Sequence, residues 1–428
     1  MTGADVDRPI QGRSFPALPA LPDRLWVPAL LAALLALSFV GALLVRADGD
    51  PSLLVHAAPP WSDAAGARSS LTVQPDVEDG FDGQFFYRLG VAPWSTDTTV
   101  DGVTFDLPAL RNARWGYGAL AFVASAGDPD LVPWSLIGLN VIAAIAVGAV
   151  GGGLARSSGR HAAWGAVLFL WPGFAYSLSL DTSELVALAF LLGGLLALRH
   201  RRWASGALLF TAAVLTRDTT AAIPFGVALA GAWTWWDARR PMPARRTDTA
   251  AGGPIAAGQE DEQAAAIDLA TAGLVALFAF GSWQMLQRHR FGAFPLTSSG
   301  DKNLSGPLGG LVDLLRNVIP PSSGEEAFRL LSVAGLLGLI GLAAWCWPRS
   351  TTPLAERVAW LPAVAVVVLL NAYLWSGATA FMRASTEAGL LSILVIMGSP
   401  RRWLLSLASA GLAGLWLLTA AAQLSKLG

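Results

Sequence analysis

Apolar segments of about 20 residues recur along the whole chain, and this feature constrains the fold more than any other. A helix needs about 20 apolar residues to cross the hydrocarbon layer of a membrane. Only 14% of the 428 residues are charged, whereas roughly a quarter are charged in a soluble domain. The sequence therefore predicts an all-α fold, a polytopic helical bundle that lies in a membrane.

We expect about 11 transmembrane helices. Two of the segments, 184–198 and 203–217, are short for a span, so they favour tilted or re-entrant helices. The predicted spans are residues 26–45, 131–155, 161–180, 184–198, 203–217, 219–236, 266–287, 327–347, 356–376, 382–398 and 402–423.

Arginines are sorted between the loops, and this sorting predicts the orientation of the chain. Cytoplasmic loops of membrane proteins carry an excess of Lys and Arg. The first span follows three arginines and is long enough to be a retained signal anchor. Alternate short loops carry the others, so we expect the N-terminus in the cytoplasm and the C-terminus outside. These arginines are Arg8, Arg13, Arg24, Arg156, Arg160, Arg199, Arg201, Arg202, Arg239, Arg240, Arg245, Arg246, Arg349, Arg357, Arg401 and Arg402.

The spans and loops divide the chain into two membrane modules. Residues 1–25 are a cytoplasmic tail, and 26–236 form the first module with an external loop at 47–110. Residues 237–265 have the composition of a disordered cytoplasmic linker. The second module, 266–428, has an external loop at 288–326. Because long loops in compact proteins tend to be functional, we expect the site in these loops, with 47–110 as the catalytic one.

The stretch VEDGFDGQFFYRLG, residues 77–90, is the most distinctive part of the first loop. Gly80 and Gly83 favour a tight turn, and QFFYRL then has the pattern of a short interfacial helix. Asp82 lies near the start of that helix, where N-capping is the common role of a carboxylate. Here, however, Glu78, Asp79 and Asp82 gather where a membrane cavity would open outward.

Basic residues lie on the same predicted side. Arg217 and Asp218 in LTRDTT, and Arg383 in FMRASTE, lie at the membrane boundary. A charge there usually faces a cavity or a partner, although an arginine can also extend to the headgroups. Guanidiniums bind phosphate oxygens in pairs and stay charged. Together these residues predict a site for a phosphate-bearing amphiphile with an apolar tail.

Other kinds of site have little support in the sequence. His56, His161, His200 and His289 have no metal-ligand spacing. Cys346 is the single cysteine, so the chain can build no cysteine-based metal centre. Nothing in the sequence indicates nucleic-acid binding.

The chain resembles the GT-C superfamily of multi-spanning glycosyltransferases, which use sugars carried on polyprenyl phosphate. The resemblance is carried by the long acidic first external loop and by GFDGQFFYRLG, which is similar to the GYDGQFYYRL segment of a poorly characterised bacterial GT-C-like group. RNARWGYG, LTRDTT and FMRASTE lie where arginines of that group recur.

The resemblance implies inverting transfer to an extracytoplasmic acceptor of the cell envelope, with Asp82 as general base and Asp79 as second candidate. The implied substrate-binding residues are Arg217, Arg383, Glu78, Gln84, Arg88, Arg114, Asp218, Arg288 and Lys302. No second acidic pair marks a metal site, so the need for a divalent cation such as Mg²⁺ or Mn²⁺ stays open. Only 2 of the 29 basic residues are lysine, which suggests a high-GC bacterial genome. This lineage makes mannose and arabinofuranose the first candidates for the transferred sugar.

Two other functions are compatible with the same residues. A transporter or flippase for an anionic or polyprenyl-linked glycolipid also needs arginines in a cavity, but it needs no carboxylate beside a reacting carbon. A non-catalytic subunit of an envelope-building complex would need Asp82 only for folding or for partner binding. The need for a carboxylate in the first loop therefore distinguishes the enzyme from the two alternatives.

Overall fold

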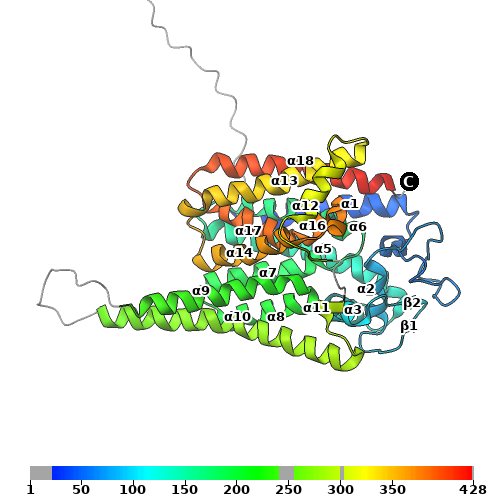
Figure 1. Cartoon of the computed structure of the whole chain (residues 1–428), viewed down its shortest axis with the longest axis horizontal. Helices are drawn as coiled ribbons and strands as arrows, with labels where there is room; N and C mark the ends of the chain where they lie inside the picture. Colours follow the sequence, from blue (N-terminus) through cyan, green and yellow to red (C-terminus); the bar gives the residue numbers. More distant parts are fainter. Residues whose placement is uncertain (1–21, 241–254, 299–302, 427–428) are drawn as a thin grey trace, which may run out of the picture.

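A computed structural model of the chain describes residues 22–240, 255–298 and 303–426. The described part is mostly helical, and its one sheet pairs β1 (Thr99–Val100) with β2 (Val103–Thr104) in antiparallel register. Figure 1 shows the helices lying side by side along the long axis of the molecule. The all-α prediction is confirmed.

Five of the described helices are long and apolar enough to cross a membrane, which indicates a membrane protein. A sixth candidate is the pair of α16 (Ala378–Ala384) and α17 (Thr386–Met397), which together pass the same test but are bent by 58° at Ser385. The five are α1 (Trp26–Arg46), α5 (Val132–Ser157), α10 (Ile255–Phe291), α13 (Gly324–Cys346) and α18 (Arg402–Lys426).

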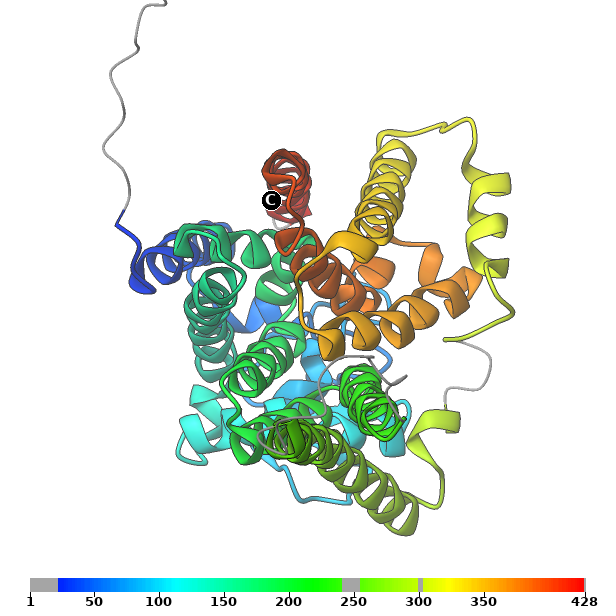
Figure 2. The same cartoon turned by 90° about the vertical axis from the view of Figure 1, so that its left-hand side faces the viewer.

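The remaining predicted spans are also helical, but they are shorter. Figure 2 looks along the bundle and shows several of them enclosed by their neighbours. All residues of α17 are buried, as are most residues of α7. A helix that is apolar on every side is buried, so composition alone does not separate a span from a core helix. The shorter helices are η3 (Ala162–Leu170), α6 (Pro172–Ser179), α7 (Glu184–Arg199), α8 (Trp203–Thr216), α9 (Ala222–Ala238) and α14 (Leu354–Leu369).

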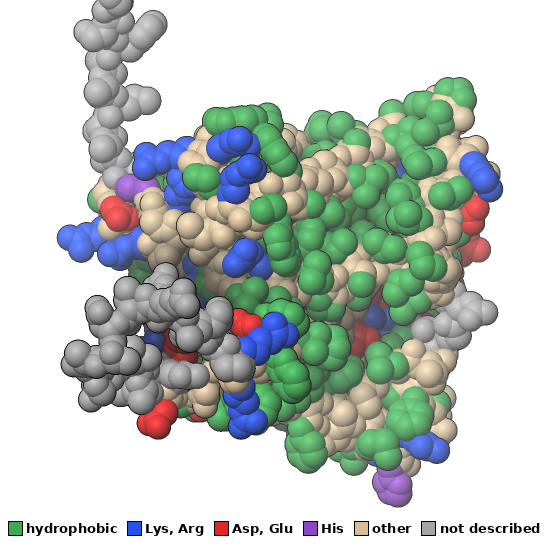
Figure 3. Space-filling model, turned by 60° about the vertical axis from the view of Figure 1, so that its left-hand side comes forward, with side chains coloured by type: hydrophobic (Ala, Val, Ile, Leu, Met, Phe, Trp, Pro, Cys, Tyr) green, Lys and Arg blue, Asp and Glu red, His purple; other side chains and the backbone are tan. Residues whose placement is uncertain are grey.

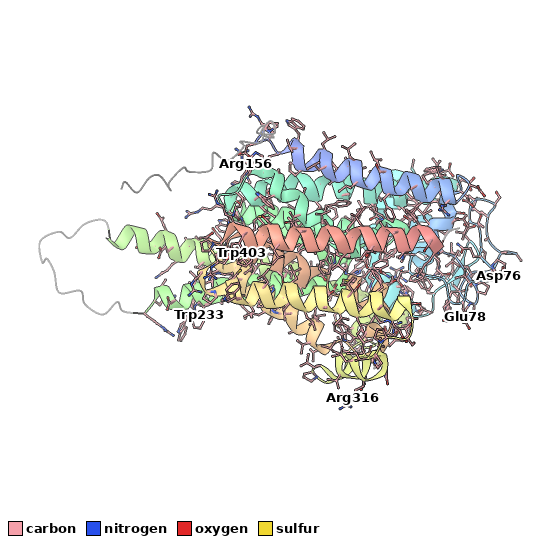
Figure 4. All side chains as sticks on the ribbon, turned by 90° about the horizontal axis from the view of Figure 1, so that it is seen from above. Asp76, Glu78, Arg156, Trp233, Arg316 and Trp403 are labelled. Carbon is pink, nitrogen blue, oxygen red and sulfur yellow. The ribbon has the colours of Figure 1, made fainter. Side chains whose placement is uncertain are left out.

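The two ends of the bundle differ in charge. In Figure 4, Asp76 and Glu78 lie at one end, and Arg156 lies toward the other with Trp233 and Trp403. The C-terminus lies at the acidic end (Figure 1). Hydrophobic side chains cover much of the side seen in Figure 3, and basic side chains gather toward its left. This arrangement matches the sorting of arginines in the sequence.

The first long loop, residues 47–110, is a folded unit. It contains η1 (Pro51–Val55), α2 (Gly83–Val91), the small sheet and the start of α3 (Pro108–Ala113); α4 (Trp115–Ala124) and η2 (Pro129–Leu131) follow it. The predicted helix at QFFYRL is confirmed as part of α2, but the prediction that its aromatic side chains lie at a membrane interface was wrong. Phe85, Phe86 and Tyr87 are buried, because α2 packs against α4 and α5 inside the protein.

The other two predicted loops are shorter than expected. Residues 255–265, predicted as part of a disordered linker, form the first turns of α10, and α9 continues to Ala238; residues 241–254 lie outside the described part. Between α10 and α13 the chain forms α11 (Pro295–Ser298) and α12 (Gly309–Val318). Figure 4 shows α12, marked by Arg316, standing out from the side of the bundle. The last short elements are η4 (Asp218–Ala221), η6 (Trp347–Arg349) and α15 (Ala372–Trp375).

Gly83 joins the first loop to the bundle. A Cβ atom at this position would lie 2.6 Å from the carbonyl oxygens of Leu180 and Val55. Both are backbone atoms, so neither can rotate away as a side chain could. The absence of a side chain therefore lets the start of α2, with Asp82 before it, approach the connection between α6 and α7.

We expect Gly83→Ala to lower the free energy of unfolding by about 1–3 kcal/mol, because the added methyl group forces the backbone apart. Thermal unfolding in detergent or nanodiscs, followed by tryptophan fluorescence, measures this change. Gly41→Ala is the matched control, because a Cβ at Gly41 in α1 meets no atom within 4 Å. Equal stability of the two variants would contradict the close contact.

Candidate functional site

Asp82 lies at the N-cap position of α2, but its side chain makes no capping hydrogen bond. Its carboxylate instead accepts hydrogen bonds from Arg111 Nη1 at 2.6 Å and Arg383 Nη2 at 2.7 Å. Arg114 Nη1 is 3.7 Å away. Three guanidiniums therefore converge on one carboxylate. N-capping of α2 does not explain the Asp82 side chain, because it makes no capping hydrogen bond.

Each of these arginines also has a second carboxylate. Arg111 binds Asp106 through Nε and Nη2, both at 2.7 Å. The Nε of Arg383 donates to Glu184 at 2.8 Å, and the Nε of Arg114 donates to Asp218 at 3.2 Å. The second contacts hold the guanidiniums in place without help from Asp82.

A deeper group of charges continues from Arg383. Glu184 is fully buried at the start of α7 and also pairs with Arg217. The Nε of Arg217 is 3.2 Å from Glu387, and its Nη2 donates to the backbone oxygen of Arg383 at 2.8 Å. Thr219 Oγ1 donates to Glu387 at 2.7 Å. This group has almost no contact with solvent.

We call these nine charged residues the arginine–carboxylate cluster. It contains five carboxylates and four guanidiniums, in an outer part that is 9–22% exposed and an inner part that is 0–7% exposed. Figure 3 shows acidic and basic atoms lying together in a recess between hydrophobic side chains. The outer part is Asp82, Asp106, Arg111, Arg114, Asp218 and Arg383, and the inner part is Glu184, Arg217 and Glu387.

The arginines determine the ionisation of Asp82. Burial alone raises the pKa of this carboxyl, but Arg111, Arg383 and Arg114 outweigh burial and hold the pKa well below its usual range. Asp82 is therefore ionised at neutral pH. While all three guanidiniums contact it, it is a weak proton acceptor.

Five of the sequence-predicted site residues meet in this cluster: Asp82, Arg114, Arg217, Asp218 and Arg383. They come from the first loop, from the junction between α3 and α4, from the connection between α8 and α9, and from α16. The structure thus brings together five predicted residues that come from separate stretches of the sequence.

Two predicted residues hold the first loop together instead. Gln84 is buried, and its Oε1 accepts from Ser62 Oγ at 2.8 Å while its Nε2 donates to the backbone oxygen of Asp79 at 3.0 Å. Arg88 is buried, donates to the backbone oxygen of Asp97, and lies 3.6 Å from the ring centre of Phe105. Their positions fit a structural role.

The other predicted residues lie apart from the cluster. Glu78 and Asp79 are exposed and make none of the cluster's ion pairs among the described residues. Arg288 is exposed and lies 4.4 Å from the ring centre of Phe294. Lys302 lies outside the described residues.

Sequence reasoning missed Arg111, Asp106, Glu184 and Glu387. Arg111 and Glu387 lie within the quoted stretches RNARWGYG and FMRASTE, but they were not singled out. Glu184 carried a signal, because an acidic residue in the first turn of an apolar helix usually has a partner or a function. The pairing of Arg111 with Asp106 depends on the folding of the loop and had no such signal.

The described residues contain no group of three His, Cys, Asp or Glu side chains arranged to hold a metal ion. The carboxylates of the cluster are occupied by guanidiniums, which is a poor donor set for a cation. No protein-family model matches the chain, and no curated protein matches it.

We expect Glu184→Gln to lower the free energy of unfolding by about 3–5 kcal/mol, because the change leaves Arg217 and Arg383 with uncompensated buried charge. Thermal unfolding of the purified protein in nanodiscs measures the loss. Glu325→Gln is the matched control: Glu325 is 80% exposed and, among the described residues, forms an ion pair with Arg329 alone, one turn away, so its loss is worth well under 1 kcal/mol. A Glu184 variant as stable as this control would show that the inner part contributes nothing to folding.

The depressed pKa of Asp82 predicts a pH dependence with a definite sign. The folded-state pKa lies below the unfolded value of about 3.9, so the stabilisation is complete above that value and is lost as pH falls below it. The difference in melting temperature between wild type and Asp82→Asn should be constant from about pH 5 to 9 and should shrink below about pH 4. A difference that changes near pH 7 would mean that Asp82 titrates there.

Proposed function

We propose that the protein is a multi-pass glycosyltransferase of the bacterial plasma membrane. Its N-terminus is cytoplasmic, about 11 helical segments span the membrane, some of them short and enclosed by the longer helices, and its site opens outside. It moves a sugar from a polyprenyl-phosphate donor to an acceptor of the cell envelope, with inversion at the anomeric carbon. Mannose and arabinofuranose are the first sugars to test.

One observation carries this proposal. Three guanidiniums, each anchored by a carboxylate of its own, converge on the partly exposed Asp82. Such an array is a preorganised anion site. We infer that the carboxylate of Asp82 occupies the place that an anionic group of the substrate takes when it is bound.

The surroundings favour an amphiphilic substrate. The array lies at the acidic end of a bundle whose long helices are apolar (Figure 1), and hydrophobic side chains cover much of the side of the bundle seen in Figure 3. A phosphate on a long isoprenoid chain places its charge at the membrane boundary and its chain among the lipids. Guanidiniums suit this group because they bind phosphate oxygens in pairs and remain charged.

The transfer step can be written with these residues. The acceptor hydroxyl oxygen attacks the anomeric carbon and forms the new glycosidic bond, and its proton passes to Asp82. The bond between the anomeric carbon and the phosphate oxygen breaks, and polyprenyl phosphate leaves with the electron pair. Arg111, Arg114 and Arg383 stabilise the charge that develops on the phosphate.

The same arginines couple the transfer of the acceptor proton to Asp82 with the departure of the phosphate. In the free protein they make Asp82 a weak base. When the donor phosphate shares the guanidiniums, their hold on Asp82 weakens and its pKa rises toward the usual range. The base is then strongest when the donor is in place, and the guanidiniums released as Asp82 takes the proton are available to the leaving phosphate.

We expect Asp82→Asn to lower the rate of sugar transfer by about 10²–10⁴-fold, the usual contribution of a general base. The measurement follows label from radiolabelled decaprenyl-phosphate mannose or arabinofuranose into acceptor lipids, with the purified protein in proteoliposomes. Asp79→Asn is the matched control, because Asp79 lies outside the cluster, and it should transfer at nearly the wild-type rate.

A binding measurement separates the two roles of Asp82. Because Asp82→Asn removes the carboxylate that competes for the guanidiniums, this variant should bind decaprenyl phosphate at least as tightly as wild type, whereas Arg383→Gln should bind it more weakly. Full transfer by Asp82→Asn would overturn the base assignment. Donor lipid that moves between leaflets without being consumed would replace the enzyme with the transporter.

A further inference from the structure

Asp181 is a buried carboxyl group that the proposed mechanism does not use. It lies in the short connection between α6 and α7, three residues before Glu184, and is completely buried. Its backbone adopts the left-handed conformation with φ of +45°. Neither carboxyl oxygen has a hydrogen-bond partner among the residues that the structure describes.

A second orphaned oxygen borders the same turn. Asn140 on α5 is fully buried, and its Oδ1 also has no partner in the described part of the chain. Its Nδ2 donates to Tyr117 Oη at 2.7 Å and to the backbone oxygen of Ser177 at 3.2 Å. That same carbonyl oxygen accepts from the backbone N–H of Thr182, the neighbour of Asp181, at 3.2 Å.

Tyr117 connects the two groups electrostatically. Its Oη donates to the backbone oxygen of Leu136 at 2.8 Å, so it offers no further proton to Asp181. It lies close enough to Asp181 and to Glu184 to be affected by both charges. Asp181, Asn140 and Tyr117 thus form one buried polar group behind the arginine–carboxylate cluster.

The contrast with Glu184 shows what Asp181 lacks. Glu184 is equally buried, but it pairs with Arg217 and Arg383 and accepts from Ser177 Oγ at 3.0 Å. An ionised carboxylate with no such partners would be prohibitively costly in this interior, and a buried group of this kind neutralises instead. Burial accordingly raises the pKa of Asp181 well above its usual value.

We propose that Asp181 is a buried proton-binding site whose carboxyl group is protonated in the folded protein at neutral pH. One bound proton turns the Asp181 carboxyl group, which has no hydrogen-bond partner among the described residues, into a hydrogen-bond donor. Asn140 Oδ1, which borders the same turn and lacks a donor, is the acceptor that this proton best satisfies. The site is separate from the ionised carboxylates of the cluster.

The proton also protects the inner part of the cluster. If Asp181 lost it, a second negative charge would appear beside Glu184, in a place where no described guanidinium contacts Asp181. Tyr117 on α4, Tyr176 on α6, Glu184 on α7 and Asp82 before α2 are the tyrosines and acids that face this turn or lie on elements packed against it. The basic groups are Arg217, Arg383 on α16, Lys426 on α18, and His56, whose side chain hydrogen-bonds to the backbone of Ser179. Alkaline pH should therefore loosen the connection that positions Glu184.

The sign of the pH dependence is opposite to that of Asp82. Since the folded-state pKa is raised, the stabilisation is complete below the unfolded value of about 3.9 and is lost as pH rises through the folded-state pKa. The melting temperature of wild type should thus fall more steeply toward alkaline pH than that of Asp181→Asn, which is nearly the same shape and always neutral.

Infrared spectroscopy of the full chain in nanodiscs tests the proposal directly. At pH 7 we expect a protonated-carboxyl band in wild type that shifts when aspartate is labelled with ¹³C. The band should be lost in Asp181→Asn and kept in Asp76→Asn, because Asp76 is exposed. If Asp181→Asn does not fold, the label shift and the pH at which the band disappears in wild type still test the site.

Two results would overturn the proposal. One is a wild-type spectrum without a label-sensitive protonated-carboxyl band at pH 7, or a band that survives in Asp181→Asn. The other is a melting temperature that rises when Na⁺ replaces choline in wild type but not in Asp181→Asn. That result would assign the orphaned oxygens to a metal cation.

Discussion

The arginine–carboxylate cluster is the interaction on which the arrangement of the bundle's acidic end depends. Charges that leave water lose solvation, and the low-dielectric interior compensates for the loss only when each charge has well-placed partners. Here the partners come from six parts of the chain, so all of them have to meet at one place. Arg383 is the connecting member, since it contacts Asp82 on the solvent side and Glu184 on the buried side. The first loop is thereby fixed to the helices.

The same pairing explains why the cluster is organised around Asp82. An arginine bound by one carboxylate alone would follow that carboxylate when it moved. Because Arg111, Arg114 and Arg383 have second anchors, the guanidiniums remain in place when Asp82 turns away. This is the property that a site for an exchangeable anion requires, and it distinguishes the outer part from the inner part, where Arg217 is enclosed.

Much of the fold could be predicted from the sequence, because long apolar segments predict helices by their composition alone. It could not separate spans from enclosed helices such as α17, since both are apolar on every side. The motif at Asp82 was found because carboxylates are rare in such a chain. Its partner Arg111 was missed because their contact depends on how the loop folds, and α2 was expected at the interface because its aromatic residues fit a headgroup layer as well as a protein core. Asp181 gave no signal beyond being an acidic residue between two apolar segments.

The distance along the chain between paired residues has a consequence for synthesis. Asp82 and Arg383 are 301 residues apart, and Arg217 and Glu387 are 170 apart. A ribosome that has completed the first module has made Asp82, Glu184 and Arg217 but not the arginine that joins them. The growing chain must therefore keep several charges hydrated until α16 and α17 have been made. The complete set of arginines around Asp82 therefore comes together only near the end of translation.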